Sequence, residues 1–270
     1  MPKDTRTKEK TPLSSLCRKV EFTVPTCWKE LTQEQLRYML RLLWLYNNHE
    51  DGQQRVLVAA FLYFCGTEVT RRTDQGWLCR QRGSEKAWIL DPDLLPSLLQ
   101  SVEWLADTEQ MDVRIERVGD CKAVDFELQE LPFGKYLEAE NWFQSYLQSR
   151  QENCLRELAK ILYLVADGSE GPGFKEEELL GVFLWFNAAK QLLGRMFPNF
   201  LKPAEGKAEP VTQESLIEVT RAQIRLLTKG DVTKQKYILE ETDTWTALAE
   251  LDALAKEAEE IKRKYGASRT

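Results

Sequence analysis

The sequence predicts a mainly α-helical protein with a small antiparallel β element near residues 67–90. First, apolar side chains recur at helical spacing from Leu36 to Tyr46 and through most of the chain after Pro132. Second, the region between contains short runs of β-favouring residues separated by turn residues. Third, hydrophobic residues make up 43% of the 270 positions and charged residues 30%, which is ordinary for a globular protein.

A capping box marks the start of the first predicted helix. The Thr32 hydroxyl and the Gln35 amide are spaced to satisfy the first free backbone N–H groups. Apolar residues follow at helical spacing: Leu36, Met39, Leu40, Leu43 and Tyr46. Residues 56–64 predict a second helix, and residues 20–24, which alternate apolar and polar side chains before Pro25, predict a short strand.

The predicted β element is a meander of short strands. Runs at residues 67–72, 77–82 and 86–90 favour strands, and Gly76 and Gly83 supply the turns between them.

A further helix and strand are expected after the meander. Asp91 is a good N-cap and Pro92 suits the first helical position, so a helix should run to about Leu105. Pro96 should kink this helix or delay its start. Residues 113–118 alternate apolar and polar side chains and predict one more strand.

From Pro132 onward the chain is expected to be helical. Residues 136–146 and 155–165 each place apolar side chains on one helical face. A long helix is predicted from Glu176 to Met196. It should end at Phe197-Pro198, since proline cannot continue the backbone hydrogen bonding.

The chain is predicted to divide into a tail, a main domain, a linker and a C-terminal unit. Residues 1–17 are charged and predict a solvated tail. Residues 18–201 predict the mainly helical domain that contains the meander. Residues 202–211 predict the linker, and residues 212–270 predict a C-terminal helical unit with a narrow apolar stripe and charged flanks.

Charge and hydropathy exclude several classes of partner. The formal net charge is -6 and the pI is near 5.2, so nucleic acid is not expected as a partner. No apolar run approaches the ~20 residues that a bilayer span needs, and no membrane partner is expected. The charged N-terminus lacks the apolar core of a secretory signal.

The cysteine pattern predicts neither disulfides nor a zinc site. The six cysteines are Cys17, Cys27, Cys65, Cys79, Cys121 and Cys154. No two of them have CxxC spacing, and the one histidine is His49. We expect these thiols to be reduced, as in a cytosol, and mostly buried.

The sequence predicts no catalytic, cofactor or metal site. It contains no phosphate-binding glycine loop, dinucleotide fingerprint, serine-nucleophile elbow or zinc-protease motif. The loop before Glu178 has some spacing of a calcium loop, but Pro172 replaces the central glycine. Glu176, Glu177 and Glu178 are carboxylates that the first turn of a helix favours. We therefore expect a protein that is not an enzyme.

Several segments carry a likeness that spans nearly the whole chain. They are Val24–Thr32, Leu131–Leu137, Trp185-Phe186, Phe197–Phe200, Ala222–Thr233 and Asp243–Leu251. Together they resemble a family of helical proteins encoded in the tail-region gene clusters of phages and prophages of gut bacteria. The resemblance implies a role in building a phage tail, and it brings no catalytic residues with it.

The expected function is that of a non-enzymatic, chaperone-like tail-assembly factor in the host cytoplasm. Its partners are expected to be other phage tail proteins or a second copy of itself. One alternative is a structural component of the virion, such as a tail connector or terminator. Another is an enzyme with an unfamiliar site.

The C-terminal unit contains the predicted partner-binding residues. A helix with a narrow apolar stripe buries little surface alone, so it should find a partner. We expect a partner-facing or dimer-facing groove lined by Ile224, Leu227, Trp245, Leu248 and Leu251. The alternative is a C-terminal helix docked on the core of its own chain.

Overall fold

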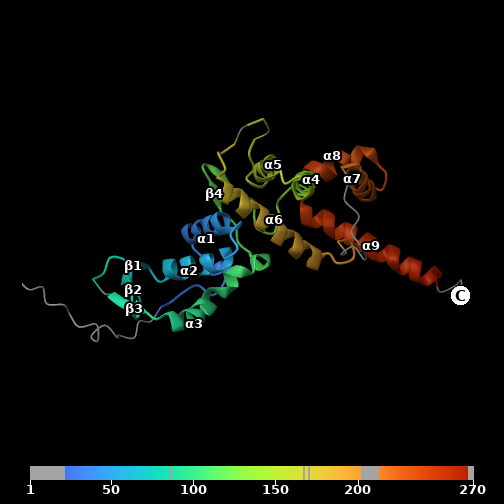
Figure 1. The fold of residues 1–270 in the computed structure, drawn as a ribbon. Helices are drawn as coiled ribbons and strands as arrows, with labels where there is room; N and C mark the ends of the chain where they lie inside the picture. The colour runs from blue at the N-terminus through green and yellow to red at the C-terminus, as the bar shows by residue number, and fades with distance from the viewer. Residues whose placement is uncertain (1–21, 86, 167, 170, 202–212, 267–270) are drawn as a thin grey trace, which may run out of the picture. The chain divides into compact units, whose positions relative to one another are not determined.

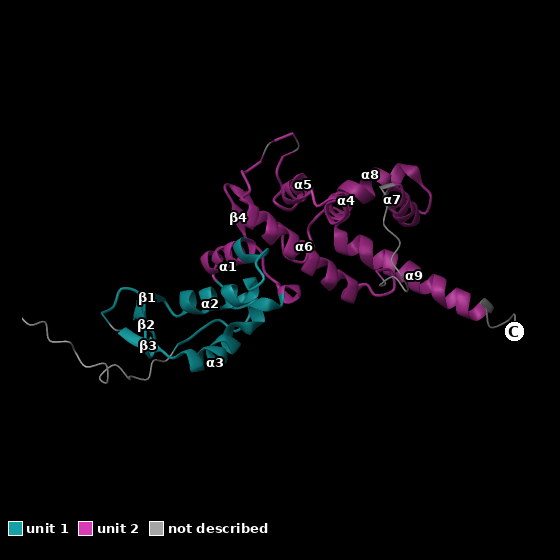
Figure 2. Cartoon of the chain, in the orientation of Figure 1, with its two compact units in different colours: residues 1–31, 45–107 teal, residues 32–44, 108–270 magenta. Residues whose placement is uncertain are grey.

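The chain is mainly α-helical, as the sequence predicts, and it forms two compact units (Figure 2). The structure is a computed structural model that describes residues 22–85, 87–166, 168–169, 171–201 and 213–266. Unit 1 comprises Met1–Leu31 and Leu45–Asp107, and unit 2 comprises Thr32–Trp44 and Thr108–Thr270. Within the described ranges, no helix is long and apolar enough to cross a membrane.

Unit 1 contains a three-stranded antiparallel sheet, which confirms the predicted meander. Strands β1 (Thr67–Thr73), β2 (Gly76–Gln81) and β3 (Ala87–Leu90) lie in that order across the sheet. Gly76 has a φ of 130°, and a Cβ atom there would lie 2.2 Å from the Leu90 carbonyl oxygen. Only glycine fits this approach of the two strands.

Helix α2 (Gly52–Phe64) confirms the second predicted helix and buries Val56, Ala60 and Phe61. The strand predicted at residues 20–24 is wrong for its described part, residues 22–24, which has no regular secondary structure. The Phe22 ring instead packs against Phe61 and Trp88, with ring centroids 5.9 and 5.3 Å apart. Aromatic packing, and not a neighbouring strand, holds this segment.

The helix predicted after Asp91 forms as three short pieces. They are η3 (Pro92–Leu94), α3 (Leu95–Leu99) and η4 (Gln100–Ala106). Asp91 caps the first piece as predicted, because its Oδ1 accepts a hydrogen bond from the Asp93 backbone N–H at 2.9 Å. Pro96 lies in the first turn of α3, where its missing N–H matters least.

Helix α1 (Gln33–Tyr46), whose residues up to Trp44 belong to unit 2, begins with the predicted capping box. The Gln35 backbone N–H donates to Thr32 Oγ1 at 3.2 Å, and the Thr32 N–H donates to Gln35 Oε1 at 2.8 Å. Both contacts satisfy donors that a helix start leaves free. The helix then buries one face, formed by Leu36, Met39, Leu40 and Leu42.

The strand predicted at residues 113–118 is wrong over most of its length. Only β4 (Arg117–Val118) pairs, with β5 (Cys121–Lys122) across a tight turn. Before β4, the Gln33 side chain takes the place of a partner strand, since its Oε1 accepts from the Glu116 backbone N–H at 2.9 Å. The alternating pattern here is anchored by a side chain and forms no extended ladder.

Three helices supply about half of the buried hydrophobic residues of unit 2. They are α4 (Phe133–Ser149), α5 (Glu152–Leu162) and α6 (Glu176–Met196), and α6 has the predicted bounds. Trp185 of α6 is buried, and its indole N–H donates to the Phe126 carbonyl at 3.0 Å. Phe186 packs against Phe143 of α4, with ring centroids 5.2 Å apart.

The C-terminal helices pack within unit 2. They are α7 (Gln213–Thr228), η6 (Val232–Lys234), α8 (Gln235–Glu240) and α9 (Thr244–Gly266). Helices α7 and α8 lie against α4 (Figure 1). Gly134 of α4 comes so close to α8 that a Cβ atom there would lie 2.7 Å from the Leu239 carbonyl oxygen. At the start of α9, Thr244 Oγ1 donates to the Leu131 carbonyl at 2.7 Å.

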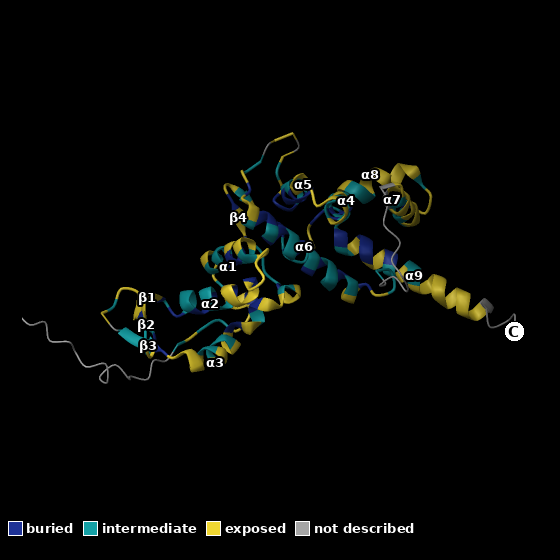
Figure 3. Ribbon diagram, in the orientation of Figure 1, coloured by how far each residue is buried: buried dark blue, intermediate teal, exposed yellow. Residues whose placement is uncertain are grey.

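The two units therefore divide the chain differently from the predicted domains. Residues 213–266 share unit 2 with α4–α6, and Thr244 at the start of α9 is hydrogen-bonded to Leu131, two residues before α4. The predicted tail (residues 1–17) and linker (residues 202–211) lie outside the described residues. The first half of α9 contains its buried residues, and residues 256–264 are exposed (Figure 3).

Candidate functional site

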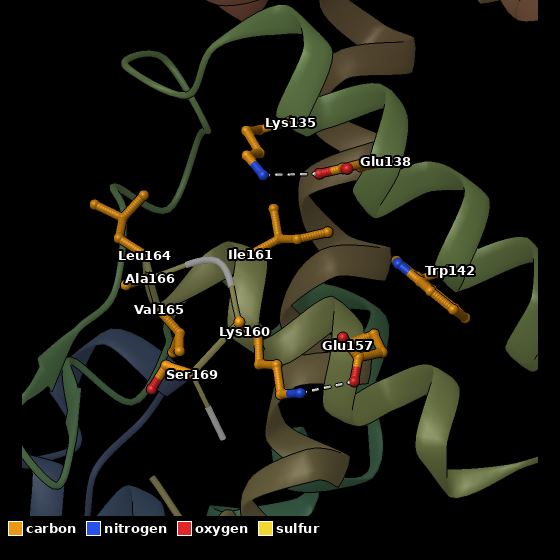
Figure 4. A pocket seen from close by; sticks show the side chains of 11 residues that line it. Lys135, Glu138, Trp142, Glu157, Lys160, Ile161, Leu164, Val165, Ala166 and Ser169 are labelled. Atoms are coloured by element: carbon orange, nitrogen blue, oxygen red, sulfur yellow. Dashed lines mark hydrogen bonds and ion pairs between the residues drawn. The ribbon is translucent and has the colours of Figure 1, made fainter. Parts of the chain in front are cut away.

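Unit 2 contains an open groove of about 730 Å³ between α4, α5 and the segment that follows α5 (Figure 4). We call it the α4–α5 groove. Its lining residues are Lys135, Glu138, Trp142, Glu157, Lys160, Ile161, Leu164, Val165, Ala166, Gly168 and Ser169. Residues three and four apart share one face of a helix, which is why α4 and α5 each bring several of these side chains to the groove.

Two ion pairs line the walls of the groove. On α4, Lys135 Nζ lies 3.0 Å from Glu138 Oε2, and on α5, Lys160 Nζ lies 2.8 Å from Glu157 Oε1. Ile161 lies between the two pairs (Figure 4). The arrangement places apolar surface between charges of both signs, with no net charge on the two pairs.

Leu164 occupies an unusual backbone position in the lining of the groove. The end of α5 is capped by two hydrogen bonds, from the Leu164 N–H to the Ile161 carbonyl (3.2 Å) and from the Val165 N–H to the Lys160 carbonyl (2.9 Å). Leu164 itself has a φ of 49°, where such a cap ordinarily has glycine. Its side chain is 64% exposed. A left-handed leucine costs about 1–2 kcal/mol, and this one buries little surface to offset it.

The structure places the five predicted partner-binding residues around the core of unit 2. Leu248 and Leu251 are each 1% exposed, so they pack within their own chain. The Trp245 indole N–H donates to the Glu127 carbonyl at 2.7 Å. Ile224 and Leu227 of α7 are half-buried. Leu248 and Leu251 are therefore covered by their own chain, and contact of Ile224, Leu227 and Trp245 with a partner stays a prediction.

Glu178 has a role that the sequence pattern does not reveal. Its carboxylate is buried, forms an ion pair with Arg37 of α1 and accepts a hydrogen bond from the Lys175 backbone N–H at 3.0 Å. Arg37 also donates to the Arg117 carbonyl. The network ties α1 to the start of α6. Arg37 and Glu178 are 141 positions apart, so no local spacing could have predicted their contact.

The described cysteines Cys27, Cys65, Cys79, Cys121 and Cys154 are free thiols. Burial raises the pKa of the Cys65 thiol to about 12. Among the residues that the structure describes, no cluster of three or more histidine, cysteine, aspartate or glutamate side chains could hold a metal ion. Cys17 lies outside that part of the chain.

Comparisons of the chain with protein-family models, with curated proteins and with solved structures gave no match. The geometry of the α4–α5 groove is therefore the structural ground for proposing a function. In chemical terms, the α4–α5 groove offers apolar contacts and paired charges, which suit the binding of a protein segment.

Proposed function

We propose that this chain is a chaperone-like assembly factor of a phage tail, without enzymatic activity, that holds another tail protein through the α4–α5 groove. The proposal rests on Leu164, which lines the groove, is exposed and has a backbone in the left-handed conformation. Backbone strain of this kind clusters at functional sites. A leucine at this position is explained if its side chain contacts a client protein.

The groove also has the layout of a protein-binding surface. Protein interfaces combine an apolar centre with a polar rim, and here Ile161 and Trp142 are accompanied by two ion pairs. Exposed ion pairs are worth about 0–1 kcal/mol, so a client can rearrange them at little cost. The matching client segment carries an apolar side chain flanked by charges of both signs.

The resemblance to proteins of tail-region gene clusters supports a tail protein as the client. In this proposal the protein acts in the host cytoplasm, before the tail is complete, and releases its client on assembly. A tail connector or terminator, in contrast, stays in the finished particle. The two functions therefore differ in where the protein is found at the end of assembly.

The test combines isolation of the protein from infected cells with mass spectrometry of purified particles. We expect one tail protein to copurify with the chain in stoichiometric amount, and we expect the chain to be missing from the particle. Stoichiometric presence in the particle contradicts the chaperone proposal and identifies a structural component. Failure of any tail protein to bind the chain contradicts the client proposal itself.

A matched pair of variants links the binding to the groove. Leu164→Asp adds a charge to the groove lining, and aspartate tolerates the left-handed conformation, so the fold should be kept. Ile261→Asp makes the same kind of change at another exposed side chain, in the second half of α9. The first variant should lose the tail protein and the second should retain it. Equal retention by both variants contradicts binding at the α4–α5 groove.

A further inference from the structure

The walls of the α4–α5 groove carry their charges in the same order along its length. Helices α4 and α5 are joined only by residues 150–151, and helices joined by so short a loop run antiparallel. On α4, Lys135 comes three positions before Glu138. On α5, Lys160 comes three positions after Glu157. Because the helices run in opposite directions, both lysines lie toward one end of the groove and both glutamates toward the other.

Figure 4 shows this order. Both lysines lie on the side of Leu164 and both glutamates lie on the side of Trp142. The dipoles of the antiparallel helices α4 and α5 oppose each other, so the charged side chains set the polarity of the groove. We call its two ends the Leu164 end and the Trp142 end. The first is positive and the second is negative.

The three largest apolar side chains of the lining form a row between the two ion pairs. Leu164, Ile161 and Trp142 follow one another across the groove (Figure 4). Leu164 is exposed, and the other two side chains are half-buried. Along α4 the lining extends from Lys135 to Trp142, which is about 10 Å of helix. An occupant that covers the row has to present three apolar groups within about that length.

A helix meets this requirement better than an extended segment does. Helical positions i, i+4 and i+7 lie on one face and span about 10 Å. In a strand only alternate side chains face the same way, ~7 Å apart, so about two of them reach the row. The described lining residues come from two helices and a loop, so they offer no sheet edge that a strand could join.

We infer that the client presents an amphipathic helix to the α4–α5 groove, with its C-terminal end at the Leu164 end. Its three apolar anchors contact Leu164, Ile161 and Trp142. The partial negative charge of its C-terminus then lies beside the lysines, and the partial positive charge of its N-terminus lies beside the glutamates. Basic side chains near its start and acidic side chains near its end complete the match. The inference rests on the proposed client binding and adds the shape and direction of the bound segment.

The first experiment uses two synthetic alanine-rich peptides of identical composition, each about 20 residues long. Both carry three leucines at helical spacing and a hydrocarbon staple on the opposite face, so both are helical. The matched peptide has lysines near its start and glutamates near its end, and the reversed peptide has the opposite order. Calorimetry with the full-length chain should show that the matched peptide binds at least about tenfold more tightly.

Three results of this experiment overturn the inference. They are equal binding of the two peptides, tighter binding of the reversed peptide, and no binding of either. A third peptide has the side chains of the matched one, but prolines replace its central alanines and prevent a helix. It should not bind, and binding as tight as that of the matched peptide overturns the helical assignment.

Charge-swapped variants of the chain test the direction of the bound helix. Lys135→Glu combined with Glu138→Lys reverses the pair on α4, where both side chains are at least 40% exposed, so the fold should be kept. One wall then opposes the other, and the preference between the two peptides should disappear. Adding Glu157→Lys and Lys160→Glu reverses both walls, so this variant should prefer the reversed peptide. An unchanged preference for the matched peptide in either variant overturns the inference.

The matched control swaps an ion pair outside the groove lining. Lys236→Glu combined with Glu240→Lys reverses an exposed pair on α8 and should leave the preference for the matched peptide unchanged. Failure of this inference is distinguishable from failure of the proposed function. If the two peptides bind equally while a tail protein still copurifies with the chain, the direction of the bound helix is wrong and the client proposal stands. If no tail protein binds the chain, the client proposal itself fails, and this inference fails with it.

Discussion

The carboxylate of Asp252 in α9 accepts two hydrogen bonds from Asn199, one from its backbone N–H and one from its side-chain amide, both at 2.7 Å. The same carboxylate accepts a third from the Phe200 backbone N–H at 2.9 Å. Asn199 follows the end of α6, where Pro198 prevents further helical hydrogen bonding. Asp252 thus accepts hydrogen bonds from backbone N–H groups in the turn after α6 and connects that turn to α9.

Loss of this contact should destabilise unit 2. We expect Asp252→Ala to lower the free energy of unfolding by about 1–2 kcal/mol, because two backbone donors lose a charged acceptor in a half-exposed setting. Glu250→Ala, at an exposed position of the same helix, should change it by less than about 0.5 kcal/mol. Urea denaturation of the two variants measures the difference. An equal loss of unfolding free energy in Asp252→Ala and Glu250→Ala contradicts a specific role for Asp252.

The contribution of Asp252 should also depend on pH. Burial opposes its ionisation, but the hydrogen bonds from Asn199 and Phe200 and the charge of Lys256 outweigh burial and lower the pKa of the carboxyl. A carboxyl whose pKa falls on folding stabilises the native state above its unfolded pKa, about 3.9, and loses that effect as pH falls through the folded value. The stability gap between wild type and Asp252→Ala should therefore be constant near neutrality and shrink below about pH 4. A stability difference between wild type and Asp252→Ala that stays constant down to about pH 2 contradicts a stabilising role for the ionised Asp252 carboxylate.

Phe197 should be a major contributor to the core beside that turn. It is 7% exposed, and its ring lies edge-on to Trp245, with centroids 5.5 Å apart. Phe197→Ala should cost about 3–5 kcal/mol. The neighbouring Met196 is 50% exposed, so Met196→Ala should cost less than about 1 kcal/mol. Chemical denaturation distinguishes the two, and a cost below about 1 kcal/mol for Phe197→Ala indicates an exposed ring.

The close approach of α4 to α8 makes Gly134 sensitive to substitution. A Cβ atom there would lie 2.7 Å from a backbone oxygen, that of Leu239, and rotation of a side chain cannot relieve the clash. Overpacking of this kind costs about 1–3 kcal/mol and should outweigh the gain in helix propensity. Gly134→Ala should therefore lower the melting temperature. Gly173→Ala, where nothing lies within 4 Å of the added atom, is the control.

The cysteines should differ in reactivity in the folded chain. Cys27 is exposed, whereas Cys65 and Cys79 are buried, and burial raises the pKa of both buried thiols. A thiol reagent at about pH 8 should label Cys27 quickly and the two buried residues only as the chain unfolds. In denaturant without reductant, all six thiols of the sequence should react. Fewer than six reactive thiols indicates a disulfide.

Local signals allowed the regular elements to be predicted. The capping box at Thr32 and the helix stop at Pro198 each involve groups a few residues apart, so sequence spacing alone places them. The predicted strand at residues 113–118 failed for the opposite reason. Gln33, 83 positions before Glu116, accepts from the Glu116 N–H and donates to the Arg114 carbonyl, and alternation cannot reveal such a partner.

The candidate site was beyond the reach of the sequence for two physical reasons. Apolar spacing shows that one face of a helix is buried but not against what, so the stripe through Leu248 and Leu251 could equally face a partner or its own core. Leu164 carries no helix-stop signal, because the left-handed residue of such a cap is usually glycine. Its left-handed conformation is visible only in the backbone of the structure.

The most direct test of the account is a comparison of Leu164→Gly with Arg150→Gly. Both residues are left-handed, with φ values of 49° and 57°, and Arg150 ends α4 without lining the groove. Glycine relieves the strain at either position, so neither variant should lower the melting temperature. The free energy of unfolding should rise by up to about 1 kcal/mol.

The decisive measurement is the affinity of each variant for the proposed client, the tail protein that we expect to copurify with the wild-type chain, determined by calorimetry on the purified pair. We expect Leu164→Gly to bind at least about tenfold more weakly, since an apolar contact is lost, and Arg150→Gly to bind as the wild type does. Wild-type affinity in Leu164→Gly, or an equal loss in both variants, contradicts the assignment of client binding to the α4–α5 groove.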